Sequence, residues 1–273
     1  MILYLSLLLS VFLCASAGPG LAQELPIFDA HIHYSRPDWG VLKPKQALAI
    51  LDRAGVRRAL VSSTPDDGTL ELYRLAPRRI VPFLRPYRTQ ADMEGWHSDP
   101  GVQSYVEKRF GRSVYKGIGE FHLSAEDIDA PVIKRLAEMA LRQRLFFHAH
   151  VDEDGVERLL RHYPQVRVLW AHAGMSASTD EVGRLLDRFS NLWVELSLRY
   201  DVGQGGTLDP EWRTLFLRHP DRFMVGTDTW MTTRWEELIE ESQDTRMWLR
   251  QLPIKIAEQI AYRNGERLFG AAK

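Results

Sequence analysis

The feature that most constrains the fold is a repeated alternation of short apolar runs with amphipathic segments, which begins near residue 27 and continues through most of this 273-residue chain. The apolar runs have the length of β-strands, and the segments between them carry apolar residues at helical spacing. In "PVIKRLAEMALRQR", for example, Pro131 suits a first helical turn and Leu136, Met139 and Ala140 form an apolar stripe. The eight strand-like runs cover residues 27–33, 59–63, 80–87, 115–123, 145–151, 166–173, 192–199 and 223–229.

Eight strand–helix repeats within about 240 residues predict an α/β fold, a single-domain (β/α)8 or TIM barrel. A doubly wound open sheet would show the same alternation with fewer strands, and usually a glycine-rich turn after its first strand. Here the first run ends in "HIHYSRP", which favours the barrel. The connections are short, except for a longer one containing "TQADMEGWHSDPG", which could cover a site.

The first residues have the pattern of a secretory signal peptide. Residues 2–14 are almost entirely apolar, and the small-residue stretch "ASAGPGLAQ" follows them. We therefore expect a signal peptide over residues 1–22, cleaved after Ala17 or Ala22, and a barrel domain over residues 23–273. This predicts an exported protein, periplasmic or secreted, with no stable membrane span after cleavage. No Lys or Arg precedes the apolar run, so an uncleaved membrane anchor is the alternative.

Composition limits the chemistry. Cys14 is the only cysteine, so the mature chain would have no disulfide, and any metal must be held by histidines and carboxylates. The net charge of −1, with acidic and basic residues mixed along the chain, argues against nucleic acid as a partner. A small-molecule substrate is the expected partner, and the sequence gives no indication of oligomeric state.

Polar residues stand at the carboxyl ends of the predicted strands, the end at which TIM barrels carry their active sites. They are His31, His33, Glu120, His122, His148, His150, His172 and Asp228. A lone histidine at a strand end is more often a hydrogen-bonded structural residue, and Asp228 could simply cap a helix. In a closed barrel, however, all of these groups surround one mouth, and clustered imidazoles and carboxylates need a cation or a proton network. The joint pattern predicts a divalent metal site.

The order and spacing of these residues resemble the amidohydrolase superfamily, in particular its amidohydrolase-related (amidohydrolase 2-like) metal-dependent hydrolases. The resemblance runs from about residue 27 to residue 269 and includes "NGERLF" near the end. It implies that His31, His33 and Asp228 bind one metal ion, with His148 as a further ligand. His172 would bind a second ion or contact the substrate, so one or two ions are expected.

Two features depart from the family pattern. No lysine stands at the end of the fourth strand, but Glu120 in "GIGEFHL" resembles the strand-four glutamate of TatD-like hydrolases. Glu120 is therefore predicted as a metal ligand or, if it lies too deep, as a residue that supports one. On the fifth strand, "FFHAH" offers two histidines on one face, of which His148 is predicted as the ligand. His150 and His122 are predicted to contact the substrate.

These ligands suit zinc, and also manganese or iron. The expected reaction is hydrolysis of a small amide, lactone or ester by a metal-activated water, with Asp228 accepting its proton and His172 holding the oxyanion. Arg85 and Arg199, at the ends of the third and seventh runs, are predicted to hold a substrate carboxylate; the alternative is that each pairs with a neighbouring acid.

Two other functions fit the same residues. One is a metal-dependent non-oxidative decarboxylase of the same superfamily, and the other is a non-catalytic exported binding protein on a barrel scaffold. The presence of Asp228 favours an enzyme. A nuclease is not favoured, because no basic stretch accompanies Glu120.

Overall fold

The computed structural model describes residues 24–112 and 114–270. Its eight strands are all parallel and follow one another around the sheet in chain order. The first and last strands are joined by backbone hydrogen bonds, from Ala30 N to Val225 O (2.9 Å) and from Asp228 N to His31 O (2.8 Å). The predicted (β/α)8 barrel is thereby confirmed. Its strands are β1 Ile27–Ile32, β2 Val56–Val61, β3 Ile80–Leu84, β4 Gly117–His122, β5 Phe146–His150, β6 Arg167–Trp170, β7 Leu192–Glu195 and β8 Phe223–Met224.

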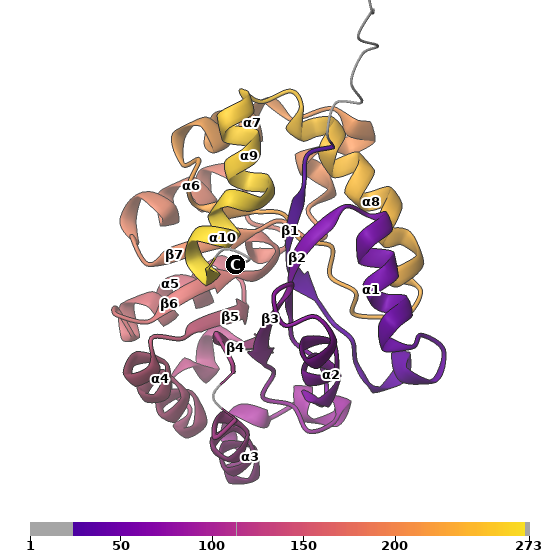
Figure 1. Ribbon diagram of the computed structural model, residues 1–273. Helices are drawn as coiled ribbons and strands as arrows, with labels where there is room; N and C mark the ends of the chain where they lie inside the picture. Colours follow the sequence, from indigo (N-terminus) through magenta and orange to yellow (C-terminus); the bar gives the residue numbers. More distant parts are fainter. Residues whose placement is uncertain (1–23, 113, 271–273) are drawn as a thin grey trace, which may run out of the picture.

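Helices surround the strands as an outer ring (Figure 1). Several begin at a proline, whose missing N–H costs nothing in a first helical turn. The main hydrophobic core lies between these helices and the strands. The helices of the ring are α1 Pro44–Arg53, α2 Asp67–Leu75, α3 Pro100–Phe110, α4 Pro131–Gln143, α5 Glu153–His162, α6 Thr179–Arg188, α7 Pro210–Arg218 and α8 Arg234–Leu249.

A C-terminal segment closes one end of the barrel. After α9 (Ile254–Glu258) and a π-helical turn, α10 (Asn264–Phe269) lies over the centre of the ring of strands (Figure 1). The ring of Phe269 packs against Phe28, Phe83 and Phe146, at centroid distances of 5.9, 5.6 and 5.0 Å. These aromatic side chains fill the amino-terminal end of the barrel interior. The carboxyl end, called the mouth below, is the end left for chemistry.

The interior changes from apolar to polar along each strand because inward-facing residues recur every second position. On β5, Phe146 belongs to the apolar floor, His148 lies above it and His150 stands at the partly exposed mouth. On β3, Phe83 likewise belongs to the apolar floor, and Arg85 follows it two residues later. The alternation of the sequence thus produces a layered interior with polar groups gathered at one end.

Several strands end earlier than the sequence predicts. β6, β7 and β8 end at Trp170, Glu195 and Met224, whereas the predicted runs extend to residues 173, 199 and 229. Both His172 and Asp228 have positive φ, 55° and 53°, a backbone conformation that cannot continue a strand. These two residues therefore stand on connecting segments that turn across the mouth.

The long β3–α3 connection packs onto the mouth beside β4. It contains two short 3-10 turns, Gln90–Met93 and Trp96–Ser98. The buried indole of Trp96 donates to His122 O at 2.8 Å, and the ring of Tyr87 stacks on that of His122. The predicted signal peptide, residues 1–22, lies outside the described residues. Within residues 24–112 and 114–270, no helix has the length and apolar character needed to cross a membrane.

Candidate metal centre

Four side chains converge at the mouth with their ligand atoms close together. His31 Nε2 lies 3.1 Å from His33 Nε2, 3.4 Å from Glu120 Oε2 and 3.6 Å from Asp228 Oδ1. His33 Nε2 lies 3.2 Å from Glu120 Oε2 and 3.3 Å from Asp228 Oδ1. All four residues are at most 4% exposed. The ring closure of the barrel has brought β1, β4 and the end of β8 to one point.

This spacing matches the ligand set of a divalent cation. Ligand atoms placed tetrahedrally at about 2.0–2.2 Å from zinc lie about 3.4 Å apart, and the five measured distances run from 3.1 to 3.6 Å. Buried Asp228 Oδ1 has no hydrogen-bond partner among the described residues, which is costly for a carboxylate that a cation does not satisfy. His31, His33, Glu120 and Asp228 are called the ligand set below.

The charges at the centre are compatible with a bound cation. Burial opposes ionisation of Glu120, Glu195 and Asp228, but the neighbouring charge of His31 outweighs it: the pKa values of both glutamates lie well below the usual range, and that of Asp228 is about 2. Burial likewise opposes the charged form of His31, yet these three carboxylates raise its pKa well above 6.5. Arg85 offsets one negative charge. A divalent ion would offset the other two and leave the imidazoles neutral, as ligands must be.

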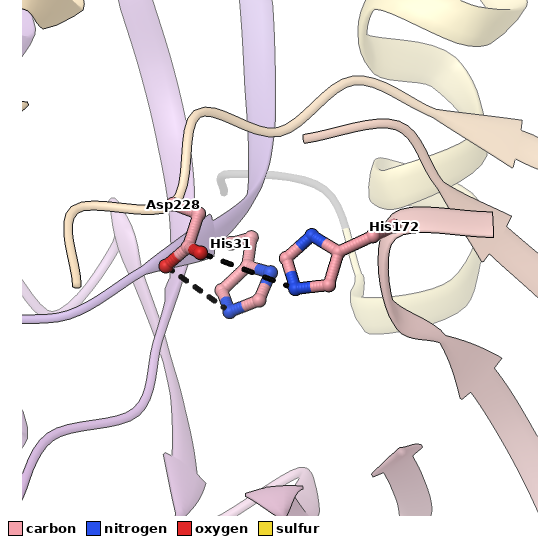
Figure 2. A group of neighbouring side chains, drawn as sticks. All are labelled: His31, His172 and Asp228. Carbon is pink, nitrogen blue, oxygen red and sulfur yellow. Dashed lines mark ion pairs between the residues drawn. The ribbon is translucent and has the colours of Figure 1, made fainter. Parts of the chain in front are cut away.

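His172 stands beside the ligand set. Its Nε2 lies 3.4 Å from Glu120 Oε1 and 3.9 Å from Asp228 Oδ2 (Figure 2). Its Nδ1 lies 3.1 Å from the carbonyl oxygen of Ser197 and 2.9 Å from that residue's Oγ. Burial lowers the pKa of His172, but the charge of Glu195 and the contact with Glu120 raise it overall. The ring is therefore held from behind with Nε2 facing Glu120 and Asp228.

The two histidines of β5 occupy different layers. His148 is fully buried beside Glu195, with its Nε2 3.8 Å from Oε1, and neither ring nitrogen makes a hydrogen bond. Burial lowers its pKa to about 4. His150 pairs with His122 in the β4–β5 register, and its Nδ1 lies 2.9 Å from Glu120 Oε1. His148 lies with His31 and Glu195 in a group whose ligand atoms are within 4.8 Å of one another and could hold a metal ion, so its role as a ligand stays a prediction.

His122 and His150 lie at the mouth as predicted for residues that meet a substrate. Both side chains are about 30% exposed, at 29% and 30%, and their rings lie 4.3 Å apart. Burial lowers the pKa of His122 to about 3, so its imidazole is neutral at physiological pH. The hydroxyl of Tyr87 contacts His122 Nδ1 at 3.2 Å and fixes the ring.

The predicted anion-binding role of the two arginines is not supported. Arg85 donates to Glu120 O (3.1 Å) and to Glu120 Oε2 (2.9 Å). Arg199 forms two 2.8 Å hydrogen bonds with the carboxylate of Asp201 and donates to the carbonyl oxygens of Ala173 and Ala177, both at 3.0 Å. It also lines a cavity of about 230 Å³ between the β7–α7 connection and α8. The structure therefore agrees with the alternative interpretation, in which Arg85 and Arg199 each pair with a neighbouring acid.

Glu195 is the important residue that the sequence did not single out. Its Oε1 lies 3.0 Å from His31 Nδ1 and accepts a hydrogen bond from His172 N at 2.7 Å, while Oε2 accepts one from Ser197 N at 2.8 Å. A Cβ at Gly226 would lie 2.5 Å from Glu195 Oε2, so only glycine leaves room for this carboxylate. The available signal was a single acid in the apolar run "NLWVEL".

Comparison with known proteins identifies the family. A family model described as amidohydrolase matches residues 37–271. The chain belongs to the amidohydrolase family. This confirms the predicted resemblance and the prediction of an enzyme, a metal-dependent hydrolase. The match begins after the His31–His33 motif of this amidohydrolase, so the place of those two residues in the site rests on the geometry above.

Solved structures share the barrel of this amidohydrolase at low sequence identity. The probable 2-pyrone-4,6-dicarboxylic acid hydrolase of Acinetobacter baumannii, with citric acid bound, is 14% identical, with a TM-score of 0.59 and coverage of 89% of this chain and 99% of the other. An amidohydrolase from Burkholderia multivorans with bound zinc is 14% identical (TM-score 0.55; 90% and 99% covered). A TatD-family hydrolase of Entamoeba histolytica is 11% identical (TM-score 0.53; 90% and 99% covered). No curated protein matches in sequence. At these identities the likeness is one of fold.

Proposed function

We propose that this amidohydrolase cleaves a small ester, lactone or amide with the help of one divalent cation held by the ligand set, and that the cation is zinc rather than manganese or iron. The observation that carries the proposal is the set of four buried donor atoms, in which His31 Nε2 and His33 Nε2 lie 3.1 Å apart and each lies 3.2–3.6 Å from Glu120 Oε2 and Asp228 Oδ1. When bound, such an ion lowers the pKa of a coordinated water toward neutrality and polarises the substrate carbonyl.

Asp228 and His172 are placed for the proton and charge movements of the reaction. Asp228 turns Oδ1 toward His31 and His33 and Oδ2 toward His172, so Oδ2 can accept a proton from the attacking water and pass it to the leaving group. His172, held at Nδ1 by Ser197, presents Nε2 to the same space and in its protonated form can donate to the developing oxyanion.

Hydrolysis fits the mouth better than decarboxylation. A decarboxylase must orient a substrate carboxylate, and the two arginines expected for this task are bound to Glu120 and to Asp201. The family match argues against a non-catalytic binding protein.

Metal analysis combined with a substrate panel tests the proposal. Purified protein is expected to contain about one zinc ion, and hydrolysis of one or more esters, lactones or amides is expected to stop on chelation and return with zinc. His31→Ala should lose the ion. Full metal content in His31→Ala, or release of CO2 from aromatic acids without hydrolysis of the panel, would contradict it.

We also propose that the protein is exported, on the strength of its first 22 residues. The expected mature chain begins at Gly18 or Gln23, after cleavage at Ala17 or Ala22. Sequencing of the amino terminus from separated cell fractions measures this directly, and an intact amino terminus on soluble cytoplasmic protein would refute it.

A further inference from the structure

The guanidinium groups of the β3–α3 and β7–α7 connections and of Arg234, the first residue of α8, are already bound within the protein. Arg85 and Arg199 make the contacts described above, and Arg88 pairs with Asp92 and Asp99. Arg234 donates to the backbone oxygens of Asp228 and Thr227, both at 2.7 Å, and to Glu241 at 2.6 Å. These arginines therefore stabilise the protein itself, and their guanidinium groups are not free to bind an anion.

The remaining connections at the mouth add little positive charge. Those after β2, β4, β5 and β6 contain neither Lys nor Arg. On the β1–α1 connection, the guanidinium of Arg36 lies 5.6 Å from the ring centre of Trp39, and Lys43 donates to Trp39 O. A substrate carboxylate at the mouth would thus face the carboxylates of Glu120 and Asp228. The four arginines described above are already paired and could not offset its charge, which is a costly arrangement for a desolvated anion.

Large apolar side chains are exposed on the same side of the mouth as His172 and Asp228. Of the nine such side chains exposed within the described residues, four stand on the connections after β6, β7 and β8. They are Met175, Tyr200, Trp230 and Met231, which are 40–62% exposed, and they are called the apolar rim below.

The apolar rim is tied closely to the reacting groups. Met175 N donates to His172 O at 2.9 Å, and Trp230 stands two residues after Asp228. The hydroxyl of Tyr200 accepts a hydrogen bond from Arg234 at 3.2 Å, and Arg234 holds the backbone of Asp228. Exposed apolar groups on the connections around an active site commonly mark a binding surface.

We infer that the substrate is an uncharged ester, lactone or amide with a large apolar substituent that lies against the apolar rim while its carbonyl meets His172 and Asp228. The inference rests on the proposed function and names its substrate class. It replaces the expectation of an anionic substrate with a different proposal. It also separates this chain from the similar structure named as a hydrolase of a dicarboxylic acid, so 2-pyrone-4,6-dicarboxylic acid is not expected to be turned over.

Three esters with one leaving group test the inference in the zinc-loaded protein: 4-nitrophenyl acetate, 4-nitrophenyl octanoate and mono-4-nitrophenyl suberate. Each methylene that leaves water contributes up to about fourfold in binding. The octanoate should therefore exceed the acetate in kcat/KM by about tenfold or more, and the suberate, which ends in a carboxylate, should fall well below the octanoate.

Variants of the rim locate the effect. Trp230→Ala and Met175→Ala should lower kcat/KM about fivefold more for the octanoate than for the acetate, whose acyl group is too short to cover the rim. Leu141→Ala is the matched control, because Leu141 is 42% exposed on α4 and lies outside the mouth. Equal rates for octanoate and suberate, or no effect of the rim variants, would overturn the inference while metal-dependent hydrolysis stands.

Calorimetric titration gives a readout that does not depend on turnover. The ketone 2-nonanone, which has no bond to hydrolyse, should bind the zinc-loaded protein at least about tenfold more tightly than 8-oxononanoic acid, its counterpart with a terminal carboxylate, and Trp230→Ala should reduce that ratio. Equal binding of the two compounds would refute the substrate class. Hydrolysis that is insensitive to chelation would instead refute the proposed function, and the inference with it.

Discussion

Glu195 Oε1 lies 3.0 Å from His31 Nδ1, on the opposite side of the imidazole from the nitrogen that faces His33, Glu120 and Asp228. The same oxygen accepts a hydrogen bond from His172 N. One carboxylate on β7 therefore orients two histidines that come from β1 and from the end of β6. Such partners of metal-binding histidines set the ring tautomer and increase ligand basicity.

Glu195→Gln should weaken zinc binding by about 10–100-fold without unfolding the protein. The amide keeps the size of the side chain but removes the charge that holds His31. Competition with a chelator of known affinity measures the change. Asp66→Asn is the matched control, since Asp66 is equally buried but binds Tyr105 and Tyr115 away from the ligand set. A native zinc affinity in Glu195→Gln would contradict the positioning role.

Asp228→Asn should reduce kcat by at least about 10²-fold with zinc at saturating concentration, because the amide cannot accept the proton of the attacking water. Its fold should persist, since Asp228 Oδ1 makes no hydrogen bond that the substitution could break. Steady-state kinetics measures kcat, and circular dichroism shows whether the fold persists. Retention of more than half of the native kcat would exclude Asp228 as the proton acceptor.

The period-two alternation of the strands was enough to predict the barrel and most of the ligand set. It places His31 and His33 on one strand end and Glu120 on another, and ring closure does the rest. The alternation could not predict how deep each side chain lies along the barrel axis. The β4–β5 register puts His150 level with His122 and His148 level with Gly119, and register depends on strands that pair only in the folded chain.

The sequence could not predict the hydrogen-bond partners of these side chains either. Arg199 binds Asp201 two residues away but also two carbonyl oxygens on the β6–α6 connection, which only the tertiary structure brings near. The positive φ values of His172 and Asp228 turn the chain at the mouth, and neither residue is a glycine that would have signalled such a turn.

Arg199→Ala should lower stability by roughly 2 kcal/mol and leave KM unchanged, because it strips donors from two carbonyl oxygens and from Asp201. Thermal unfolding and steady-state kinetics provide the two measurements. Arg218→Ala, which removes an exposed ion pair with Asp187, is the control and should cost less than about 1 kcal/mol. A large rise in KM with unchanged stability would restore Arg199 as a substrate-binding residue.

The metal-free protein should lose stability as pH rises above about 7. Carboxylates raise the pKa values of His31 and His172 above 6.5 against the effect of burial. Asp29, whose pKa burial raises from 3.8 to about 7, has already lost its contribution by that pH. A raised folded-state pKa gives stability that is complete below the unfolded-state pKa and is lost as pH rises through the folded-state value. Bound zinc should cancel this loss, because it needs the histidines deprotonated.

Thermal unfolding between pH 6 and pH 9, with chelator and with zinc, measures the effect. As pH rises, the melting temperature of the metal-free protein should fall, so that its difference from the melting temperature of the zinc-loaded protein increases. A metal-free melting temperature that stays constant or increases over this range would contradict the assignment of these proton-binding groups.

The most direct test of the central claim is anomalous diffraction at the zinc absorption edge from crystals of the zinc-loaded protein. The account predicts one dominant peak between His31 Nε2, His33 Nε2, Glu120 Oε2 and Asp228 Oδ1, at about 2.0–2.2 Å from each. A peak beside His148 and Glu195 instead, or no peak within reach of the ligand set, would contradict it.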